Sequence, residues 1–367
     1  MDGVRGLRLS VLSRHFPDPD GTAAGRILYA TCQGLLADGH EVSVCSWGPD
    51  APESDLPAWC EWRRVEGLTG PLGRLRGLLR PRRDAARTGW LPAPGTIALA
   101  DDPLSFPSVD GHSHSVVTLH YLTKLDAAAT RRRSLADVQD RRAEARAARG
   151  AHLVLAYSER VGAALGVPSS FVPIAYPIPA EPLPPVEEPV AALLADWRWP
   201  PNRVALTRLL RLWPAVRELV PAARLLLAGK GLEGMGSSEG VRTLGYVADS
   251  REVLAQAAVV PFPAPNTSGP KVKILEAIAS GIPVVTTDAG IEGLMLPGGV
   301  GAIVSSIARF GPELASLLGD PERRAAIGRA GREAAIAAHA PAPAARRRVA
   351  VLRDAFPDLA LGGDRVR

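Results

Sequence analysis

The segment from residue 267 to 294, TSGPKVKILEAIASGIPVVTTDAGIEGL, carries two cations and a carboxylate at a spacing that could hold an anionic ligand. Its cations, Lys271 and Lys273, are two of only four lysines in a chain that has 43 lysines and arginines together. Arginine is thus the usual cation of this protein, and a lysine marks a position that favours a compact ammonium group. The two remaining lysines are Lys124 and Lys230.

A helix is predicted in this segment, beginning after the turn of Gly269 and Pro270 and ending near Ser280. At 100° per residue, Lys273 and Glu276 share one face of it. A glycine ahead of a helix N-terminus lets backbone N–H groups approach an anion, and the helix dipole favours phosphate there. The lysine would then neutralise a diphosphate, and the carboxylate would accept two sugar hydroxyl groups. The alternative is an exposed ion pair worth a few tenths of a kcal/mol.

Strands and helices alternate along the rest of the chain. Buried strands are predicted at residues 7–13, 41–46, 96–100, 115–120, 152–158, 190–195, 223–229, 241–247, 259–263 and 283–288. Helices are predicted at about residues 24–36 and 203–219, with a long Arg/Ala-rich helix between the strands at 115–120 and 152–158. This alternation predicts an α/β fold with parallel sheets and helices on both faces.

A proline-dense stretch, Pro177–Pro189, divides the pattern into two halves and is predicted to be a linker. The length of 367 residues also favours two domains. Two α/β domains in tandem predict a cleft between them. Ligands of open parallel sheets bind beyond the carboxyl ends of the strands, so each domain could hold one substrate.

Four separated motifs between Ala191 and Leu294 resemble the donor-binding half of the GT-B retaining glycosyltransferases of family four, the glycosyl transferases group 1. They are ADWRWPPN, PAARLLLAGKG, LGYV and SGPKVKILEAIASGIPVVTTDAGIEGL. In the first half of the chain, GTAAG (Gly21–Gly25) and the strand-ending His120 are the main matches. The resemblance implies a GT-B fold of two facing Rossmann-like domains with a cleft between them.

The resemblance also implies a division of the chain. Residues 1–180 would form the acceptor-side domain and residues 181–340 the nucleotide-sugar-binding domain. Residues 341–367 would contain a C-terminal helix that crosses back to the first domain. The implied activity is metal-independent, retaining transfer of a hexose from a UDP- or GDP-sugar to a hydroxyl of a cell-surface glycan, glycolipid or secondary metabolite.

Residue by residue, the resemblance assigns roles to thirteen positions. His120 and Ser268 would contact the donor sugar, and Glu276 would hold the ribose. Lys230, Lys271 and Lys273 would hold the diphosphate, while Tyr246 and Val247 would lie near the base. The remaining donor-binding positions are Gly21, Thr22, Gly25, Gly269 and Pro270. Retaining transfer in this family is thought to proceed on one face, with the departing phosphate oxygen taking the acceptor proton.

Two positions depart from the family pattern. The family has a glutamate eight residues before Glu276, and this chain has Ser268, which can form a hydrogen bond with a sugar hydroxyl but supplies no charge. An arginine–lysine pair often follows the first strand of the donor domain, and here only Arg198 is present, with Asn202 where the lysine would be. The departures leave open a noncatalytic nucleotide-sugar-binding protein or a partner subunit.

Three other patterns, a dinucleotide fingerprint, a possible metal site and the cysteines, give weaker indications of function. GKGLEG, at residues 229–234, fits a dinucleotide fingerprint with Asp249 as the ribose-binding acid, but the strand that begins by Val241 leaves no room for the required helix. A nicotinamide-dependent redox enzyme is therefore not favoured. Asp110, His112 and His114 lack a complete metal-ligand set, and no metal is expected. The three cysteines form no closely spaced pair, which suits a reducing cytoplasm.

The charge of the chain is +5 with a pI near 9.4, and part of it is concentrated in Pro71–Arg87. This basic, leucine-containing segment could lie on an anionic membrane, or pack its leucines on its own sheet. Nucleic acid is not favoured, because aromatic residues make up only 5% of the chain. With neither a secretory signal nor a stretch of about 20 apolar residues, we expect a cytoplasmic protein, with contact at the inner membrane face as an option.

Overall fold

The computed structural model describes residues 6–48, 55–65, 88–130, 135–235 and 238–360. The chain divides into two compact units. The first unit comprises residues 1–124, 133–177 and 339–367, and the second comprises residues 125–132 and 178–338. The C-terminal segment therefore belongs to the first unit, and a short piece of the first half belongs to the second. The basic segment Pro71–Arg87 lies wholly within residues 66–87, outside the described part of the chain.

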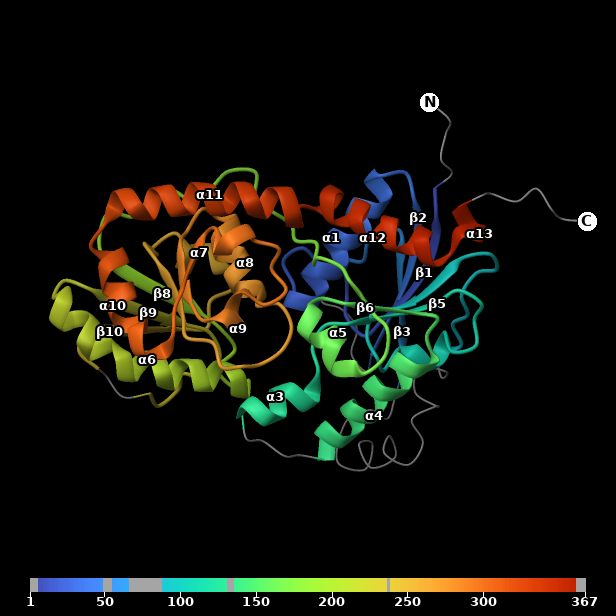
Figure 1. The fold of residues 1–367 in the computed structure, drawn as a ribbon, viewed down its shortest axis with the longest axis horizontal. Helices are drawn as coiled ribbons and strands as arrows, with labels where there is room; N and C mark the ends of the chain where they lie inside the picture. Colours follow the sequence, from blue (N-terminus) through green and yellow to red (C-terminus); the bar gives the residue numbers. More distant parts are fainter. Residues whose placement is uncertain (1–5, 49–54, 66–87, 131–134, 236–237, 361–367) are drawn as a thin grey trace, which may run out of the picture. The chain divides into compact units, whose positions relative to one another are not determined.

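The first unit is built on a parallel sheet with the strand order β3-β2-β1-β4-β5-β6-β7 (Figure 1). Its strands are β1 (Arg8–Ser13), β2 (Glu41–Gly48), β3 (Cys60–Arg64), β4 (Ile97–Ala100), β5 (Ser115–Leu119), β6 (Leu153–Ala156) and β7 (Ser170–Phe171). Every residue of β4 and β5 is buried, as expected for central strands of a parallel sheet that is covered on both faces.

The helices of the first unit come from both ends of the chain. They are α1 (Ala23–Ala37), the start of α3 (Thr123–Thr130), α4 (Leu135–Gly150), α5 (Glu159–Leu165), α12 (Pro341–Ala355) and α13 (Pro357–Ala360), with a 3-10 turn η2 (Phe106–Ser108). Helix α12 lies beside α1 (Figure 1). Their approach is close because small residues, Ala30 and Ala344, meet in a buried cluster with Ala175.

The second unit has two three-stranded parallel sheets, ordered β10-β9-β8 and β11-β12-β13. The strands are β8 (Val190–Leu194), β9 (Arg224–Ala228), β10 (Val241–Gly245), β11 (Val260–Phe262), β12 (Val284–Thr286) and β13 (Ala302–Val304). A parallel bridge between Ala191 and Val259 joins the two sheets. The combined order, third strand to first and then fourth to sixth, is that of a Rossmann fold, and the first unit repeats it.

The helices of the second unit follow these strands in alternation. They are α6 (Pro200–Leu219), α7 (Ser250–Leu254), α8 (Val272–Ala279), α9 (Asp288–Ile291), α10 (Ile307–Leu318) and α11 (Pro321–His339), with a 3-10 turn η3 (Pro297–Gly299). Helix α6 begins with two prolines, which are tolerated there because the first N–H groups of a helix need no partner within it. Helices α6 and α10 lie side by side (Figure 1).

The α/β fold class predicted from the sequence is confirmed. Each predicted strand and helix corresponds to an observed one, and α8 ends at Ala279, one residue before the predicted end. The short strands β3, β7 and β13 were not predicted, and neither were the longer helices α10 and α11. In the described part of the chain, no helix is both long and apolar enough to cross a membrane.

Candidate functional site

The strand order of each unit reverses direction at one place, between β1 and β4 in the first unit and between β8 and β11 in the second. Ligands of open α/β sheets bind outside the carboxyl ends of the strands at this reversal. The residues singled out in the sequence fall there in both units. Gly21–Gly25 and His120 follow β1 and β5, and Lys230, Tyr246 and Ser268 follow β9, β10 and β11.

The loop between β11 and α8 is held by carboxylates from elsewhere in the second unit. Ser268 donates from its backbone N–H and from its hydroxyl to Oδ1 of Asp126, at 2.7 and 2.8 Å. The N–H of Gly269, which has a φ of +74°, donates to Glu292 at 3.0 Å. Pro270 completes the turn. Two consecutive amides of this loop therefore donate to carboxylate oxygens of the protein itself.

Lys271, at the N-cap of α8, folds back on its own loop. Its ammonium donates to the carbonyl oxygen of Ser268 at 3.2 Å and to that of Gly269. The cation therefore lies beside the carboxylate-binding amides of the same loop. Its charge acts on Asp126, where it lowers the pKa of that carboxyl against the effect of burial.

Lys273 lies in the first turn of α8 and is half-buried. Its ammonium donates to Oδ1 of Asn202 at 2.9 Å and lies 4.5 Å from the centre of the Phe262 ring. Burial lowers the pKa of Lys273 to about 8, the charge of Lys271 lowers it further, and Glu276 raises it. This lysine is therefore held inside the unit by an amide and a ring, and its proton is easily lost for a lysine.

Glu276 shares the face of α8 with Lys273, as predicted. Its Oε1 accepts a hydrogen bond of 2.7 Å from the hydroxyl of Ser250, the first residue of α7. A hydroxyl group thus already occupies the carboxylate that was expected to bind ribose hydroxyls. Ser250 in turn is fixed because Asp249 caps α7.

Lys230 and Tyr246 are neighbours because β9 and β10, which they follow, are adjacent strands. The ammonium of Lys230 lies 4.7 Å from the centre of the Tyr246 ring, and Tyr246 is 64% exposed. Val247 follows at intermediate exposure. The loop after Lys230 and the N-terminal half of α6 line a cavity of about 220 Å³. An exposed cation, an exposed ring and this cavity lie at the carboxyl ends of β8 to β10.

In the first unit, His120 is half-buried and lies against Asp101. Its Nε2 donates to the backbone carbonyl of Asp101 at 2.8 Å and lies 3.5 Å from the carboxylate Oδ1 of the same residue. Burial by itself would lower the pKa of His120, but the charge and hydrogen bonds of Asp101, with the charge of Asp102, raise it above its ordinary value. Against the opposing effect of burial, His120 holds the pKa of Asp101 below its ordinary value. Both pKa shifts favour the charged forms of the pair.

The C-terminal helix contributes to the surroundings of His120. Arg348 of α12 is 2% exposed and donates to the hydroxyl of Tyr157 at 3.0 Å. The Tyr157 ring packs edge-on against His120, with 4.9 Å between ring centres. Ser13, at the end of β1, donates to the Asp101 carboxylate at 3.1 Å. Side chains from β1, the end of β6 and α12 thus fix one histidine.

The glycine loop after β1 is shaped by close packing. Thr22 caps α1, accepting from the N–H of Gly25 at 3.2 Å. A side chain at Gly25 would put its Cβ 2.3 Å from the carbonyl oxygen of Phe16, which only glycine avoids. Gly21 donates its N–H to the carbonyl of Asp18. These contacts account for the loop as a tight strand-to-helix turn.

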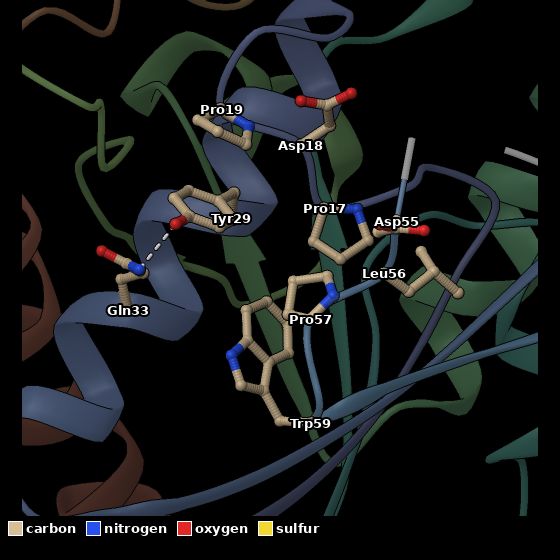
Figure 2. A pocket seen from close by; sticks show the side chains of 9 residues that line it. All are labelled: Pro17, Asp18, Pro19, Tyr29, Gln33, Asp55, Leu56, Pro57 and Trp59. Atoms are coloured by element: carbon tan, nitrogen blue, oxygen red, sulfur yellow. Dashed lines mark hydrogen bonds between the residues drawn. The ribbon is translucent and has the colours of Figure 1, made fainter. Parts of the chain in front are cut away.

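A pocket that the sequence did not predict lies on the flank of α1 (Figure 2). Its volume is about 410 Å³. The rings of Tyr29 and Trp59 line it with 6.2 Å between their centres, and the amide of Gln33 donates to the hydroxyl of Tyr29 at 2.7 Å. Asp18 and Asp55 add carboxylates to its wall. The pocket combines apolar ring faces with hydrogen-bonding groups.

The residues considered as metal ligands have other partners. Asp110 accepts from Arg146 at 2.7 Å, and His114 lies 2.8 Å from Asp358. In the part of the chain that the structure describes, no three histidine, cysteine or acidic residues form a cluster that could hold a metal ion. Lys124, which had no predicted role, donates to the carbonyl of Ala164.

Sequence reasoning missed the partners of the predicted residues. Asp126, Glu292 and Ser250 carry no motif, and only the fold brings them to Ser268, Gly269 and Glu276.

Asp101 could have been found from the sequence, because it directly follows a buried strand, as His120 does. Asn202, which stands in place of the lysine expected from the family pattern, accepts a hydrogen bond from the ammonium of Lys273. Arg198 is paired with Asp196 at 2.6 Å on the surface.

Comparison with known proteins identifies a family model and solved structures that this chain resembles. Residues 189–320 match the family model described as glycosyl transferases group 1. Among solved structures, sucrose-phosphate synthase from Thermosynechococcus elongatus superposes with a TM-score of 0.70 at 15% identity, over 96% of this chain and 100% of that one. HepE from Anabaena in complex with UDP-glucose gives 0.64 at 16% identity, over 95% and 100%.

A third structure, WaaG, a glycosyltransferase involved in lipopolysaccharide biosynthesis, gives a TM-score of 0.65 at 16% identity, over 92% of this chain and 99% of that one. No curated protein sequence matches this chain. The fold is GT-B, as the sequence predicted. Residues 189–320 are similar to the glycosyl transferases group 1, in agreement with the resemblance stated from the motifs.

Proposed function

We propose that the protein is a retaining glycosyltransferase that moves a hexose from a nucleoside diphosphate sugar to an acceptor hydroxyl. The observation that carries the proposal is the cluster at the carboxyl ends of β9 to β11, inside the group 1 domain. There Lys230 and Lys271 offer ammonium groups, the loop at Ser268 binds carboxylate oxygens through its amides, and Glu276 binds a hydroxyl. Phosphate oxygens and ribose hydroxyls require these same groups.

The bound donor would replace hydrogen bonds that these side chains now make within the protein. A ribose hydroxyl would take the position of the Ser250 hydroxyl on Glu276, and diphosphate oxygens would approach Lys230, Lys271 and Lys273. Tyr246 and Val247 would lie beside the base. Three lysines would then neutralise the diphosphate, so we propose that no metal is required. Because HepE was solved with UDP-glucose, a UDP-sugar is the first donor to test, ahead of a GDP-sugar.

His120 and Ser268 would contact the sugar. A charged His120 would donate a hydrogen bond to a sugar hydroxyl, and the glycine loop with Gly21, Thr22 and Gly25 would approach the donor or the acceptor. In retaining transfer of this kind, the acceptor hydroxyl attacks on the face from which the nucleotide leaves. The departing phosphate oxygen takes the acceptor proton, so no protein nucleophile is required.

The pocket between Tyr29 and Trp59 is our candidate for part of the acceptor site (Figure 2). Ring faces with carboxylates and an amide suit a polyhydroxylated acceptor, because they offer apolar contact together with hydrogen-bond acceptors. This favours a glycan, glycolipid or glycosylated metabolite as acceptor. We propose a cytoplasmic location with peripheral contact at the inner membrane face through the basic first half of the chain.

A thermal-shift panel of UDP-, GDP- and dTDP-sugars tests the proposal. A ligand that binds only the folded state raises the melting temperature, and the rise grows with the logarithm of its concentration relative to its Kd. We expect one nucleotide family to raise it for the wild type and to have a much smaller effect on Glu276→Ala. If a donor binds but is never consumed with any acceptor, the protein is a noncatalytic nucleotide-sugar-binding protein.

A further inference from the structure

We propose that Ser268 and Asp126 act together as the negatively polarised contact for the donor sugar, with Asp126 as the positioning residue. In this chain the pair would do what a glutamate at position 268 does in the relatives that the sequence resembles. This inference rests on the proposed function. Asp126 would supply the carboxylate that is missing from position 268, where this chain has a serine and the family pattern has a glutamate.

The geometry of the pair is specific. Asp126 Oδ1 accepts from both the backbone N–H and the hydroxyl of Ser268, at 2.7 and 2.8 Å. Asp126 lies on α3, in the stretch of residues 125–132 that belongs to the second unit. The two residues are 142 positions apart in the chain, so the contact is made by the tertiary fold and not by a local turn.

The direction of the hydrogen bonds decides what Ser268 can do for a ligand. A serine hydroxyl has one hydrogen and two acceptor lone pairs. Its hydrogen is donated to Asp126, so toward a ligand the oxygen can only accept. Because the Ser268 hydroxyl donates its hydrogen to a carboxylate, its oxygen is more negative than that of a free serine. A sugar hydroxyl or a sugar carbon that gains positive charge would be favoured beside it.

The surroundings keep the pair in place. Ser268 is 6% exposed and Asp126 is partly buried, so the interaction is poorly screened by water. The pKa of Asp126 lies above its ordinary value, because burial, together with the charge of Glu292, outweighs the lowering by the two hydrogen bonds from Ser268 and by the charge of Lys271. Glu292 accepts from the next amide of the loop, the N–H of Gly269.

Four variants test the inference. Asp126→Asn keeps an oxygen acceptor and removes the charge, and Ser268→Ala removes the hydroxyl. Ser268→Glu with Asp126→Asn moves the carboxylate to position 268, whereas Ser268→Glu alone brings two carboxylates together. Glu292→Gln is the matched control, because it changes the other carboxylate that holds this loop. Thermal melting establishes that each variant is folded.

Two measurements are made on each protein: calorimetric affinities for UDP and for UDP-glucose, and the rate of UDP release from UDP-glucose. We expect Asp126→Asn and Ser268→Ala to bind UDP as the wild type does, to lose the additional affinity for UDP-glucose, and to lower kcat by at least roughly tenfold. Ser268→Glu with Asp126→Asn should recover most of this loss, and Ser268→Glu alone should not. Glu292→Gln should change both affinities by the same factor.

Different failures have different meanings. If the wild type binds neither UDP with UDP-glucose nor GDP with GDP-mannose, the proposed function itself is overturned, and the inference falls with it. If the wild type binds a donor, but Asp126→Asn leaves the sugar-dependent affinity and kcat unchanged, only the inference is wrong. Equal loss of UDP and UDP-glucose affinity with no recovery in the double variant would also overturn it, because Asp126 would then only hold the loop.

Discussion

The ammonium of Lys273 donates a hydrogen bond of 2.9 Å to the side-chain oxygen of Asn202, joining α8 to the first turn of α6. Asn202 stands where relatives often carry a lysine. A second lysine there would face Lys273 with a like charge, whereas the amide oxygen accepts its proton. The orientation of that amide is fixed, because its nitrogen donates to the carbonyl of Asp196 at 2.8 Å.

The half-buried Lys273 predicts a pH-dependent stability. Its pKa is lowered from 10.5 to about 8, mainly by burial. Between these values the unfolded chain binds this proton and the folded chain does not, so the free energy of unfolding rises with pH across the window. Relative to Lys273→Met, the wild type should therefore gain stability from pH 8 to pH 10. Urea unfolding of both proteins at several pH values measures this, and parallel pH profiles would contradict it.

Donor binding should draw a proton onto Lys273. Near pH 8 a large fraction of this lysine is neutral, and a bound diphosphate would favour the ammonium form. Calorimetric titrations with UDP in Tris and in HEPES, whose ionisation enthalpies differ, should reveal proton uptake at pH 8. The uptake should disappear in Lys273→Met. Equal apparent enthalpies in both buffers for the wild type would show that the diphosphate does not contact this residue.

Glu276 and Ser250 should have opposite effects on donor binding. A carboxylate that binds ribose contributes charge-assisted hydrogen bonds, so Glu276→Gln should weaken UDP binding by at least about tenfold. Ser250→Ala removes the hydroxyl that now occupies Glu276 Oε1 and should bind UDP as well as the wild type or better. Calorimetry at one pH compares the three proteins. A larger loss in Ser250→Ala than in Glu276→Gln would reverse the assigned roles.

The His120–Asp101 pair predicts a stability that falls toward alkaline pH. The pKa of His120 is raised in the folded protein, so its contribution is complete below about 6.5 and is lost as pH rises through the folded value. The difference in unfolding free energy between wild type and His120→Gln should therefore shrink from pH 6 to pH 8. Asp101, whose pKa is lowered, loses its contribution only as pH falls below its ordinary range. A constant difference from pH 6 to pH 8 would contradict the charged pair.

The sequence allowed the class of fold and the face of α8 to be predicted, and the reasons are local. Strands such as β5 are runs of apolar residues, and Gly281, with a φ of +84°, ends α8 where glycine predicted a stop. The 3.6-residue period of a helix places Lys273 and Glu276 on one face without any knowledge of the fold.

What could not be predicted is the set of partners that this face and its loop meet. Asp126 lies 142 residues from Ser268 and Asn202 lies 71 residues from Lys273, and no spacing rule links such pairs. The burial of Lys273 was also hidden, because the helix period does not distinguish a solvent-facing stripe from a polar contact inside the unit. The partners and the pKa shifts of these residues therefore became visible only from the tertiary contacts.

The anomeric configuration of the first sugar released from the donor tests the central claim most directly. Proton NMR can follow the protein with UDP-α-glucose, or with the nucleotide sugar that raises its melting temperature most. Retention predicts that α-glucose appears before its mutarotation to the β form. Initial release of β-glucose would contradict a retaining mechanism, and a donor that binds without being cleaved in the presence of acceptors would contradict a transferase.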